Sequence, residues 1–331
     1  MNSGEENEVA VQRAERAAAV AAAVRGGIAE VIFGQKAVID QALITLLAGG
    51  HGLLIGVPGL AKTKLVEALG IVLGMDFKRV QFTPDLMPAD IIGSEVLEES
   101  DDRHRSFRFI KGPVFTQLLM ADEINRASPR TQSALLQAMQ ERQVTVAGTR
   151  YDLPQPFHVL ATQNPLEQEG TYPLPEAQLD RFLLQIDIDY PDKTSEKEML
   201  LATTFGEEKT AKAVCTPNDL MEAQSVVRRI PVGDAVVESI LRLVRAARPD
   251  AEAAPELRNV VAWGPGPRAC QAFMLACRAR ALIEGRLAPS TDDVVALAQP
   301  VLRHRMALNF AARAEGLTVA AVIDRLCRTL L

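Results

Sequence analysis

A glycine-rich loop between a short apolar run and a helical pattern constrains the fold of this chain more than any other segment. Residues 53–55 form a continuous apolar run typical of a buried strand, and apolar residues recur at helical spacing over 65–72. The loop between them directs backbone N–H groups and the positive end of a helix dipole toward one place, which favours a bound phosphate. The sequence therefore predicts a phosphate-binding loop, made of Gly56, Val57, Pro58, Gly59, Leu60, Ala61, Lys62, Thr63 and Lys64.

Two side chains of this loop carry the expected chemistry. Lys62 would reach the β and γ phosphates of a nucleotide, and the hydroxyl of Thr63 would bind Mg²⁺. The strict phosphate-loop pattern has glycine immediately before the lysine, whereas this chain has Ala61. Because alanine tolerates fewer backbone conformations than glycine, we expect a slightly different loop geometry at that position. The structural alternative for the segment is an ordinary Gly-Pro turn.

A pair of carboxylates follows another apolar run. Residues 118–121 belong to an expected buried strand, and Asp122 and Glu123 come directly after them. Because ligands bind at the carboxyl ends of strands in open α/β sheets, Asp122 is a candidate Mg²⁺ ligand and Glu123 a candidate for polarising an attacking water. Alone, such a pair is more often a solvated strand end. Beside a phosphate loop, the functional interpretation is favoured.

Asn164 and two arginines complete the candidate set. Asn164 would hydrogen-bond a γ phosphate if its strand lies beside the strand that ends at Asp122, although an Asn before a proline is also a common turn residue. Arg268 is expected to open a helix, where its charge opposes the helix dipole unless an anion lies nearby. Arg181 resembles a surface arginine unless the chain forms an oligomer.

Strand-like and helical segments alternate in the first part of the chain. This alternation predicts an α/β fold with a mostly parallel sheet covered on both faces. The strands are expected at residues 53–55, 78–82, 115–121 and 157–162. Two expected hairpins interrupt the alternation, one at 94–110 with a charged tip at 98–105 and one at 143–153.

The other segments favour helices. An alanine-rich stretch over 9–24 predicts a helix that Gly26-Gly27 ends, after a polar stretch at 1–8 that we expect to be disordered. Further helices are expected after Gln35 and at 131–142, 235–247, 268–284 and 292–308, the last capped by Ser290 and Asp293. These segments divide the chain into an N-terminal tail and helix (1–25), a core (26–192) and a helical C-terminal domain (193–331).

Composition excludes several classes of protein. The 331 residues are 48% hydrophobic and 24% charged, which predicts a folded soluble protein. A net charge of −6 disfavours general attraction to nucleic acid. Residues 42–61 lack charged side chains over a length that could span a membrane, but their glycines and Pro58 argue for a helix end, a strand and a loop. Four cysteines without metal-ligand spacing and the lack of a signal-peptide pattern predict a reducing, cytoplasmic location.

Taken together, these residues resemble the AAA+ ATPases, and specifically the MoxR family. The resemblance begins near Val31 and extends to the C-terminus, and Ala61 is typical of this family. The most specific stretches are residues 56–63, 121–127, 163–182 and 264–269. The resemblance implies a P-loop core with a helix-2 insert at 94–110 and a hairpin before sensor 1 at 143–153, followed by a helical lid.

The resemblance also implies a role for each candidate residue, with ATP and Mg²⁺ as cofactors. The loop from Gly56 to Thr63 is Walker A, and the Asp122–Glu123 pair is Walker B. Asn164 is sensor 1, Arg268 is sensor 2, and Arg181 is the arginine finger, with Arg126 and Arg130 as alternatives for that role. The residues expected near the adenine are Ile32, Gly34 and Gln35.

An arginine finger acts on the nucleotide of a neighbouring subunit, so the resemblance implies a ring, with a hexamer expected. Related proteins act as chaperone-like motors with a separate partner that carries a von Willebrand factor A domain, and the client here is unknown. In related rings both hairpins face the central pore. Three alternatives stay open: a magnesium-chelatase-like subunit, a motor acting on DNA, and an ATP-gated scaffold with little turnover.

Overall fold

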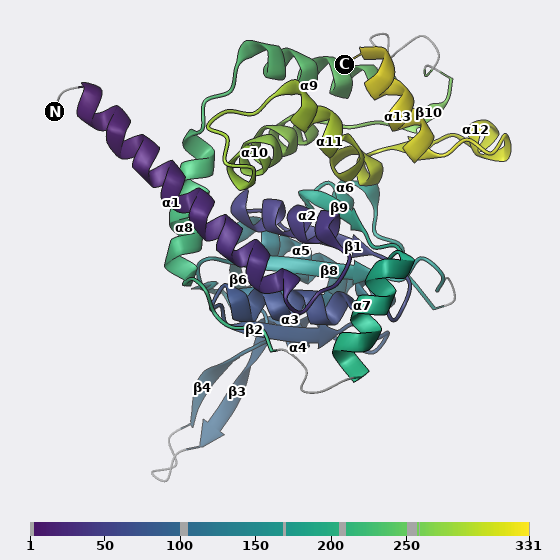
Figure 1. The fold of residues 1–331 in the computed structure, drawn as a ribbon. Helices are drawn as coiled ribbons and strands as arrows, with labels where there is room; N and C mark the ends of the chain where they lie inside the picture. Colours follow the sequence, from purple (N-terminus) through teal and green to yellow (C-terminus); the bar gives the residue numbers. More distant parts are fainter. Residues whose placement is uncertain are drawn as a thin grey trace.

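The computed structural model describes residues 3–99, 105–167, 170–204, 210–249, 257 and 259–330, with the side chains of 3–7 and 99 excepted. Its centre is a five-stranded parallel sheet with the strand order β2-β5-β8-β1-β9 (Figure 1). These strands are β1 (Gly52–Ile55), β2 (Phe77–Gln81), β5 (Leu118–Asp122), β8 (His158–Gln163) and β9 (Leu184–Asp187). The predicted α/β fold is confirmed.

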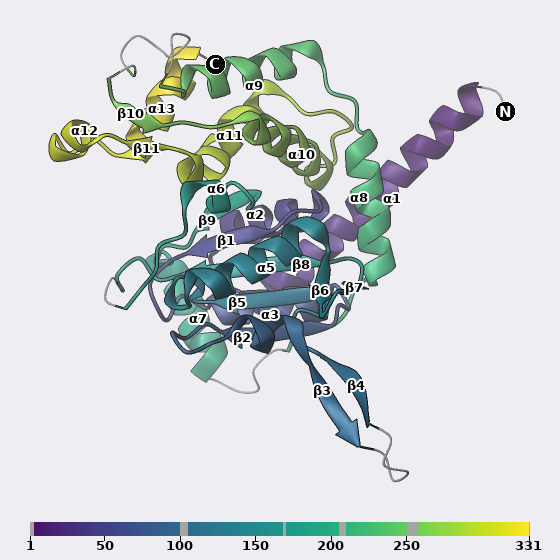
Figure 2. The same cartoon turned by 180° about the vertical axis from the view of Figure 1, so that it is seen from behind.

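The central strands β1, β5 and β8 are buried on both faces, which explains their largely apolar sequences, whereas the edge strand β2 is polar and partly exposed. Leu54 packs with α1, α2 and α3 on one face, and its neighbour Leu53 packs with α5 on the other. The two views show these helices on opposite sides of the sheet (Figures 1 and 2). The helices of this layer structure are α1 (Ser3–Ala29), α2 (Lys36–Leu47), α3 (Lys62–Val72), α4 (Pro88–Ile92), α5 (Pro129–Glu141) and α6 (Glu176–Leu179).

The strands lie close to their expected positions but not at the same bounds. The strand expected at 115–121 begins only at Leu118, because residues 115–117 turn back toward β2, where Thr116 Oγ1 donates to Asp76 O at 2.8 Å. The carboxyl ends of β1, β5 and β8 meet at one edge of the sheet, as the register of these parallel neighbours requires. Residues after these three strands therefore share one site.

Two hairpins project from this core, as predicted. The first pairs β3 (Gly93–Glu99) with β4 (Arg105–Lys111) and extends away from the body (Figures 1 and 2), and residues 100–104 of its expected tip lie outside the described residues. The second pairs β6 (Gln143–Val146) with β7 (Thr149–Asp152). Phe109 of β4 stacks on Tyr151 of β7 with ring centroids 4.1 Å apart, so the two hairpins support each other.

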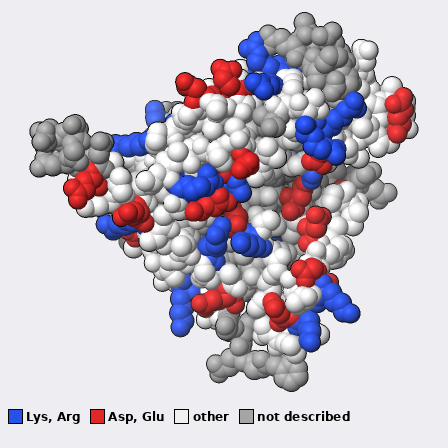
Figure 3. Space-filling view, turned by 45° about the horizontal axis from the view of Figure 1, so that its top comes forward, with Lys and Arg blue, Asp and Glu red and all other residues white. Residues whose placement is uncertain are grey.

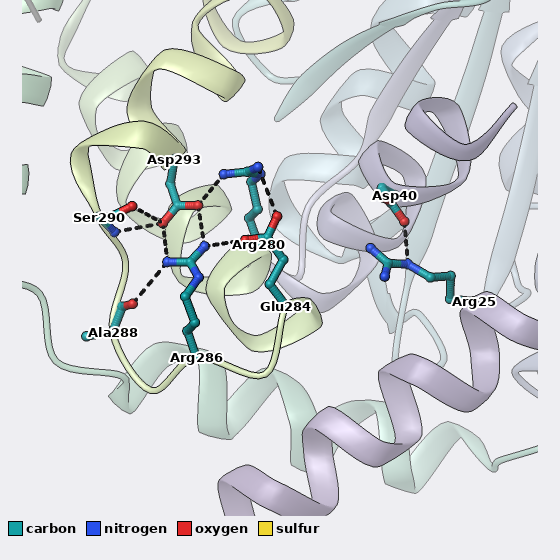
Figure 4. A network of polar contacts seen from close by, with 8 residues as sticks. All are labelled: Arg25, Asp40, Arg280, Glu284, Arg286, Ala288, Ser290 and Asp293. Atoms are coloured by element: carbon teal, nitrogen blue, oxygen red, sulfur yellow. Dashed lines mark hydrogen bonds and ion pairs between the residues drawn. The ribbon is translucent and has the colours of Figure 1, made fainter.

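The N-terminal helix differs from its prediction at both ends. Helix α1 begins at Ser3 rather than after residue 8, and it continues through Gly26-Gly27 to Ala29. Gly27 faces Val72 of α3 so closely that a Cβ there would lie 3.2 Å from Val72 Cγ1. An ion pair joins Arg25 Nε to Asp40 Oδ1 of α2 at 2.6 Å (Figure 4). Tertiary packing therefore outweighs the low helix propensity of the two glycines.

The C-terminal region is helical, with one exception. The helix expected at 292–308 ends at Leu302 and is followed by the single turn η3 (Arg303–Arg305) and by β11 (Ala307–Leu308), which pairs with β10 (Val261–Trp263). The capping pair of Ser290 and Asp293 is confirmed. The helices of this region are α7 (Lys193–Thr204), α8 (Pro217–Arg229), α9 (Asp234–Ala246), α10 (Pro267–Ile283), α11 (Thr291–Leu302), α12 (Phe310–Ala314) and α13 (Val319–Leu330).

Within the described ranges, no helix has both the length and the apolar character needed to cross a membrane. On the face drawn in Figure 3, cationic and anionic side chains are interspersed.

Candidate nucleotide-binding site

A cavity of about 410 Å³ lies at the carboxyl edge of the sheet. Three segments line it: the loop after β1, the end of β5 and the end of β8. The structure thus brings together residues that are about 100 positions apart in the sequence. The lining residues are Pro58, Gly59, Leu60, Ala61, Lys62, Thr63, Lys64, Asp122, Glu123, Thr162 and Asn164.

The loop after β1 leaves the start of α3 open to a ligand. Ala61 is the N-cap residue and has no side chain that can accept the first N–H groups of the helix. Its backbone adopts the left-handed region, with φ at 56°. Glycine favours this region, so the loop keeps a glycine-like conformation at Ala61 rather than the altered geometry that the sequence predicts, and for a non-glycine residue it costs about 1–2 kcal/mol. The N–H groups and the helix dipole of α3 together favour an anion here.

Lys62 is folded onto its own loop. Its Nζ donates to Gly56 O and, at 2.9 Å, to Val57 O. Burial lowers the pKa of Lys62, and the charges of Asp122 and Glu123 oppose that effect. The ammonium group therefore lies within the field of both carboxylates, and a phosphate in the cavity would offer it a stronger acceptor than the two carbonyl groups.

Asp122 has two partners, neither of which the sequence identified. Its Oδ1 accepts from Thr162 Oγ1 at 2.6 Å, and its Oδ2 accepts from Nη2 and Nε of Arg79 at 2.6 and 3.1 Å. The hydroxyl of Thr162 also accepts from the backbone N–H of Glu123 at 2.9 Å, so one threonine fixes both acidic residues. Alternation along β8 is the signal that would have revealed it, since Thr162 faces the cavity one residue before the strand ends.

Glu123 is held in an unusual conformation. Its φ of 54° places a non-glycine residue in the left-handed region directly after β5. Its Oε2 accepts from Gln81 Nε2 at 2.6 Å and from Arg126 Nη1 at 2.9 Å. Strain of this kind persists only where surrounding contacts impose it, and it concentrates at functional sites. Arg126, one alternative for the arginine finger, is thus engaged by the acid of its own chain.

The position of Asn164 is compatible with both interpretations that its sequence left open. It is buried at the end of β8, which is the neighbour of β5, and it lines the cavity. At the same time its Oδ1 accepts from the backbone N–H of Leu166 at 3.1 Å, as a turn-forming asparagine does. The turn orients the amide group at the edge of the cavity.

The residues expected near the adenine do not line this cavity but adjoin it. Gln35 Nε2 donates to Leu60 O of the loop at 3.4 Å, and Gln35 Oε1 is buried without a hydrogen-bond partner. Gly34 has φ at 67°, and a Cβ there would lie 2.2 Å from Ser195 Cβ of α7. Ile32 is buried beside them. A buried acceptor without a partner is costly, and a ligand amino group would satisfy it.

The two remaining arginines lie outside the lining of the cavity. Arg181 Nη1 donates to Leu136 O of α5 at 2.6 Å, and Arg268 stands in the first turn of α10. Burial lowers the pKa of Arg181, and the positive charge of Arg268 lowers it further. The structure therefore brings the two arginines near each other but not to the phosphate loop of their own chain.

Comparison with known proteins agrees with this geometry. Residues 51–184 match the family described as "ATPase family associated with various cellular activities (AAA)", and residues 256–326 match the family described as "AAA lid domain". A crystal structure of a candidate ATPase from Cytophaga hutchinsonii superimposes with a TM-score of 0.90, at 38% identity, and covers 98% of each chain.

Sequence similarity to two named proteins covers most of the chain. The chain is 41% identical over 303 residues to the Mycobacterium tuberculosis protein named "Chaperone MoxR1", which covers 91% of this chain and 79% of the relative. It is 33% identical to the Paracoccus denitrificans protein named "Protein MoxR", covering 89% of this chain and 91% of the relative. On the strength of these matches and of the core they share, the chain belongs to the MoxR family of AAA ATPases.

Proposed function

We propose that this chain binds and hydrolyses ATP in the cavity at the carboxyl edge of its sheet. The observation that carries the proposal is the convergence of Lys62, Asp122, Glu123 and Asn164 on one cavity beside the uncapped start of α3. A cation, a metal-binding acid, a candidate base and an amide donor are the groups that phosphoryl transfer to water requires.

The residues present fit a magnesium nucleotide. The uncapped N-terminus of α3 suits its phosphates, and the unpartnered Gln35 Oε1 suits the amino group of its adenine. Thr63 and Asp122 would hold Mg²⁺, which neutralises charge on the phosphates. Lys62 would stabilise negative charge on the β and γ phosphates, and Asn164 would orient the water that attacks the γ phosphate. Glu123 would polarise this water and accept its proton.

Arg181 and Arg268 are proposed to act on the nucleotide of a neighbouring copy. Burial lowers the pKa of Arg181 and the positive charge of Arg268 adds to that effect, so a bound anion near both arginines would be stabilised by their charges. The nucleotide of their own chain is not positioned to supply it, since neither arginine lines the cavity. This arrangement supports a ring, with six subunits proposed, in which each chain completes the next site. Arg130, which is exposed on α5, stays an alternative finger.

The biological role proposed is that of a chaperone-like motor. One relative is named a chaperone, and we extend that role to this chain: ATP hydrolysis would drive remodelling of a client protein, in the cytoplasm, with a separate partner that carries a von Willebrand factor A domain. The proposed units are residues 1–25, 26–192 and 193–331. A magnesium-chelatase-like role within the same chemistry stays an alternative.

A scaffold that binds ATP with little turnover is the second candidate function. In this structure each of the three charged groups is engaged within the chain: Lys62 with carbonyl groups, Asp122 with Arg79, and Glu123 with Gln81 and Arg126. A resting state of this kind favours low activity until a neighbour or a partner changes these contacts.

Steady-state ATP hydrolysis over a range of protein concentrations tests the proposal, with Lys62→Ala, Glu123→Gln and Arg181→Ala measured in parallel and the oligomer sized with ATP present. A specific activity that rises on assembly and is lost in all three variants supports the motor. If the protein binds ATP and assembles but hydrolyses no faster than Glu123→Gln, the scaffold function is favoured.

A further inference from the structure

A buried arginine from the C-terminal region holds the segment that carries Arg181. Arg305 lies in η3, the turn where α11 stops, and its side chain is only 2% exposed. Its Nε donates to Asp180 Oδ1 at 2.7 Å, its Nη2 to Phe182 O at 2.6 Å, and its Nη1 to Leu183 O at 3.1 Å and to Val301 O at 2.6 Å. Three of these four bonds therefore end on residues 180–183, the segment that contains Arg181.

A second side chain of the same turn supports this contact. His304 is buried, and its Nε2 lies 3.1 Å from Phe182 O, to which it donates. Burial, followed by the charge of Arg305, lowers the pKa of His304 well below its ordinary value, so the ring is neutral and takes part as a hydrogen-bond donor. Two adjacent residues thus donate hydrogen bonds to the backbone on the C-terminal side of Arg181.

Within the core, these hydrogen bonds of Arg305 and His304 reach only the segment from Asp180 to Leu183, among the described residues. Arg303, the first residue of the turn, contacts β9 instead: its Nη1 pairs with Asp187, and its Nε and Nη2 donate to Gln299 Oε1. The exposure of the two arginine side chains also differs: Arg305 is almost fully buried, whereas Arg303 remains partly exposed. One turn therefore carries two ion pairs to the core, of which only one reaches the residues beside Arg181.

We propose that Arg305 is a positioning residue for Arg181, which it holds in the orientation that serves the nucleotide of the neighbouring subunit. The inference rests on the proposed function of Arg181. Arg305 binds the side chain of the residue before Arg181 and the carbonyl group of the residue after it, while Leu136 O accepts a hydrogen bond from the Arg181 guanidinium group itself. A planar guanidinium with several directed donors sets such geometry, and a lysine cannot replace it.

This placement links two sites of a ring. Arg305 lies within residues 256–326, which match the AAA lid family, whereas Asp180 and Arg181 lie within the matched AAA core. A shift of the lid in one subunit therefore moves the arginine that completes the next subunit's site. The state of one nucleotide site would then affect hydrolysis at its neighbour through a direct contact.

Arg305→Lys tests the proposal in the full-length chain, with Asp180→Asn as a second variant that alters the same contact from the core. Arg303→Gln is the matched control, because it removes the other ion pair between this turn and the AAA core without touching residues 180–183. We expect Arg305→Lys and Asp180→Asn to lower ATP hydrolysis by about 10²-fold, since a small misplacement of a catalytic group costs about that much. Binding of a fluorescent ATP analogue and assembly should be unchanged, and Arg303→Gln should retain the wild-type rate.

A mixing experiment separates positioning from a general structural role. Lys62→Ala has a defective site but an intact Arg181, so in mixed rings it supplies a working finger to a subunit whose own finger is misplaced. A mixture of Arg305→Lys with Lys62→Ala should hydrolyse ATP faster than the sum of the two proteins alone. A variant damaged at its own nucleotide site would gain nothing from this neighbour.

The parallel mixture of Arg181→Ala with Lys62→Ala distinguishes failure of the proposed action of Arg181 from failure of the proposed role of Arg305. If this mixture gains no activity, the proposed action of Arg181 on a neighbour is wrong. If it gains activity while mixtures with Arg305→Lys and Asp180→Asn do not, the proposed function stands and Arg305 is no positioning residue. Loss of activity in Arg303→Gln equal to that in Arg305→Lys would likewise overturn the inference.

Discussion

Two aspartates show how differently the lid region and the proposed nucleotide site use charge. Asp293 of α11 is completely buried and binds Arg280, Arg286 and the backbone N–H of Ser290, all from the lid region (Figure 4). Burial would raise the pKa of Asp293, but hydrogen bonds from Arg286 and Ser290 lower it below its usual value. Because this carboxylate is buried, no ligand from solvent can replace its partners.

Asp122 has the same kind of neighbours but an open side. Its arginine partner, Arg79, comes from β2 and is 47% exposed, and the carboxylate lines a cavity. A pair with one exposed member contributes little to stability, about 0–1 kcal/mol, so its loss is easily tolerated. The contrast teaches that a buried carboxylate held by two arginines maintains the fold, whereas a carboxylate at a cavity is free to change partners.

The largest expected effect distinguishes the two aspartates. Asp293→Asn leaves two arginines around a neutral group, and we expect a loss of about 3–5 kcal/mol in the free energy of unfolding. Asp122→Asn should lose about 1 kcal/mol or less and should abolish ATP hydrolysis. Urea unfolding of both variants, with ATP hydrolysis measured under folding conditions, checks the pair.

Asp292→Asn is the control, because this neighbour of Asp293 in the first turn of α11 is exposed. Its free energy of unfolding should stay close to that of the wild type. Equal destabilisation by Asp293→Asn and Asp122→Asn would break the comparison.

The next effect concerns the opposite edge of the sheet, where two buried histidines should lower the free energy of unfolding in acid. His51 and His158 are fully buried there, and burial is the main cause that lowers their pKa values to about 3 and about 4. Each ring is neutral, because His51 Nδ1 accepts from Val159 N–H and His158 Nε2 accepts from Gln224 Nε2. The folded state therefore resists protonation that the unfolded state accepts.

The sign follows from these lowered pKa values. Above about pH 6.5 both states carry neutral histidines and the stability is complete, and it falls as the pH drops toward 4 because only the unfolded chain takes up protons. At pH 5 the loss should be about 2 kcal/mol per histidine. Urea unfolding at pH 7.5 and pH 5 measures it, and His158→Gln should reduce the difference between the two values. An unchanged difference would mean that His158 is already charged in the folded protein.

The sequence predicted those parts of the site that local pattern determines. The loop from Gly56 to Lys64 and the residues after β5 and β8 were found because each follows a short apolar run in a parallel sheet, whose carboxyl ends must meet. Thr162 and Arg79 were missed, since their importance arises from pairing across strands with Asp122, about 40 residues away.

The same limit explains the errors in the helices. The end of α11 at Leu302 depends on contacts of Arg303 and Arg305 with residues more than 100 positions earlier, which helical periodicity over 292–308 does not contain. The continuation of α1 through two glycines depends on its packing against α3. In both places tertiary contacts decide between conformations that local propensity ranks the other way.

A smaller effect is expected at Arg79, the partner that Mg²⁺ would have to replace on Asp122. Arg79→Gln should lower the Mg²⁺ concentration needed for half-maximal binding of an ATP analogue, by about fivefold or less, because a half-exposed pair is worth about 1 kcal/mol at most. Titration of Mg²⁺ against a fluorescent analogue checks it. Arg108→Gln, which removes an exposed pair with Glu98 on the hairpin, should change nothing. A higher Mg²⁺ requirement in Arg79→Gln would show that Arg79 helps to build the metal site.

The smallest expected effect concerns the strained loop itself. Ala61→Gly removes a Cβ from a residue at φ 56°, which relieves about 1–2 kcal/mol, while the greater freedom of glycine in the unfolded chain offsets about 0.5–1 kcal/mol. A net gain of about 1 kcal/mol or less in the free energy of unfolding should follow. Ala147→Gly is the matched control, since Ala147 has φ at 46° in the β6–β7 turn and lies away from the cavity. Both alanines are exposed, so neither change removes packing.

Equal gains in the two variants would mean that strain at Ala61 is a property of the residue type alone. A gain in Ala147→Gly with a loss in Ala61→Gly would mean instead that the alanine restricts the loop to the conformation in which Lys62 and the start of α3 face the cavity.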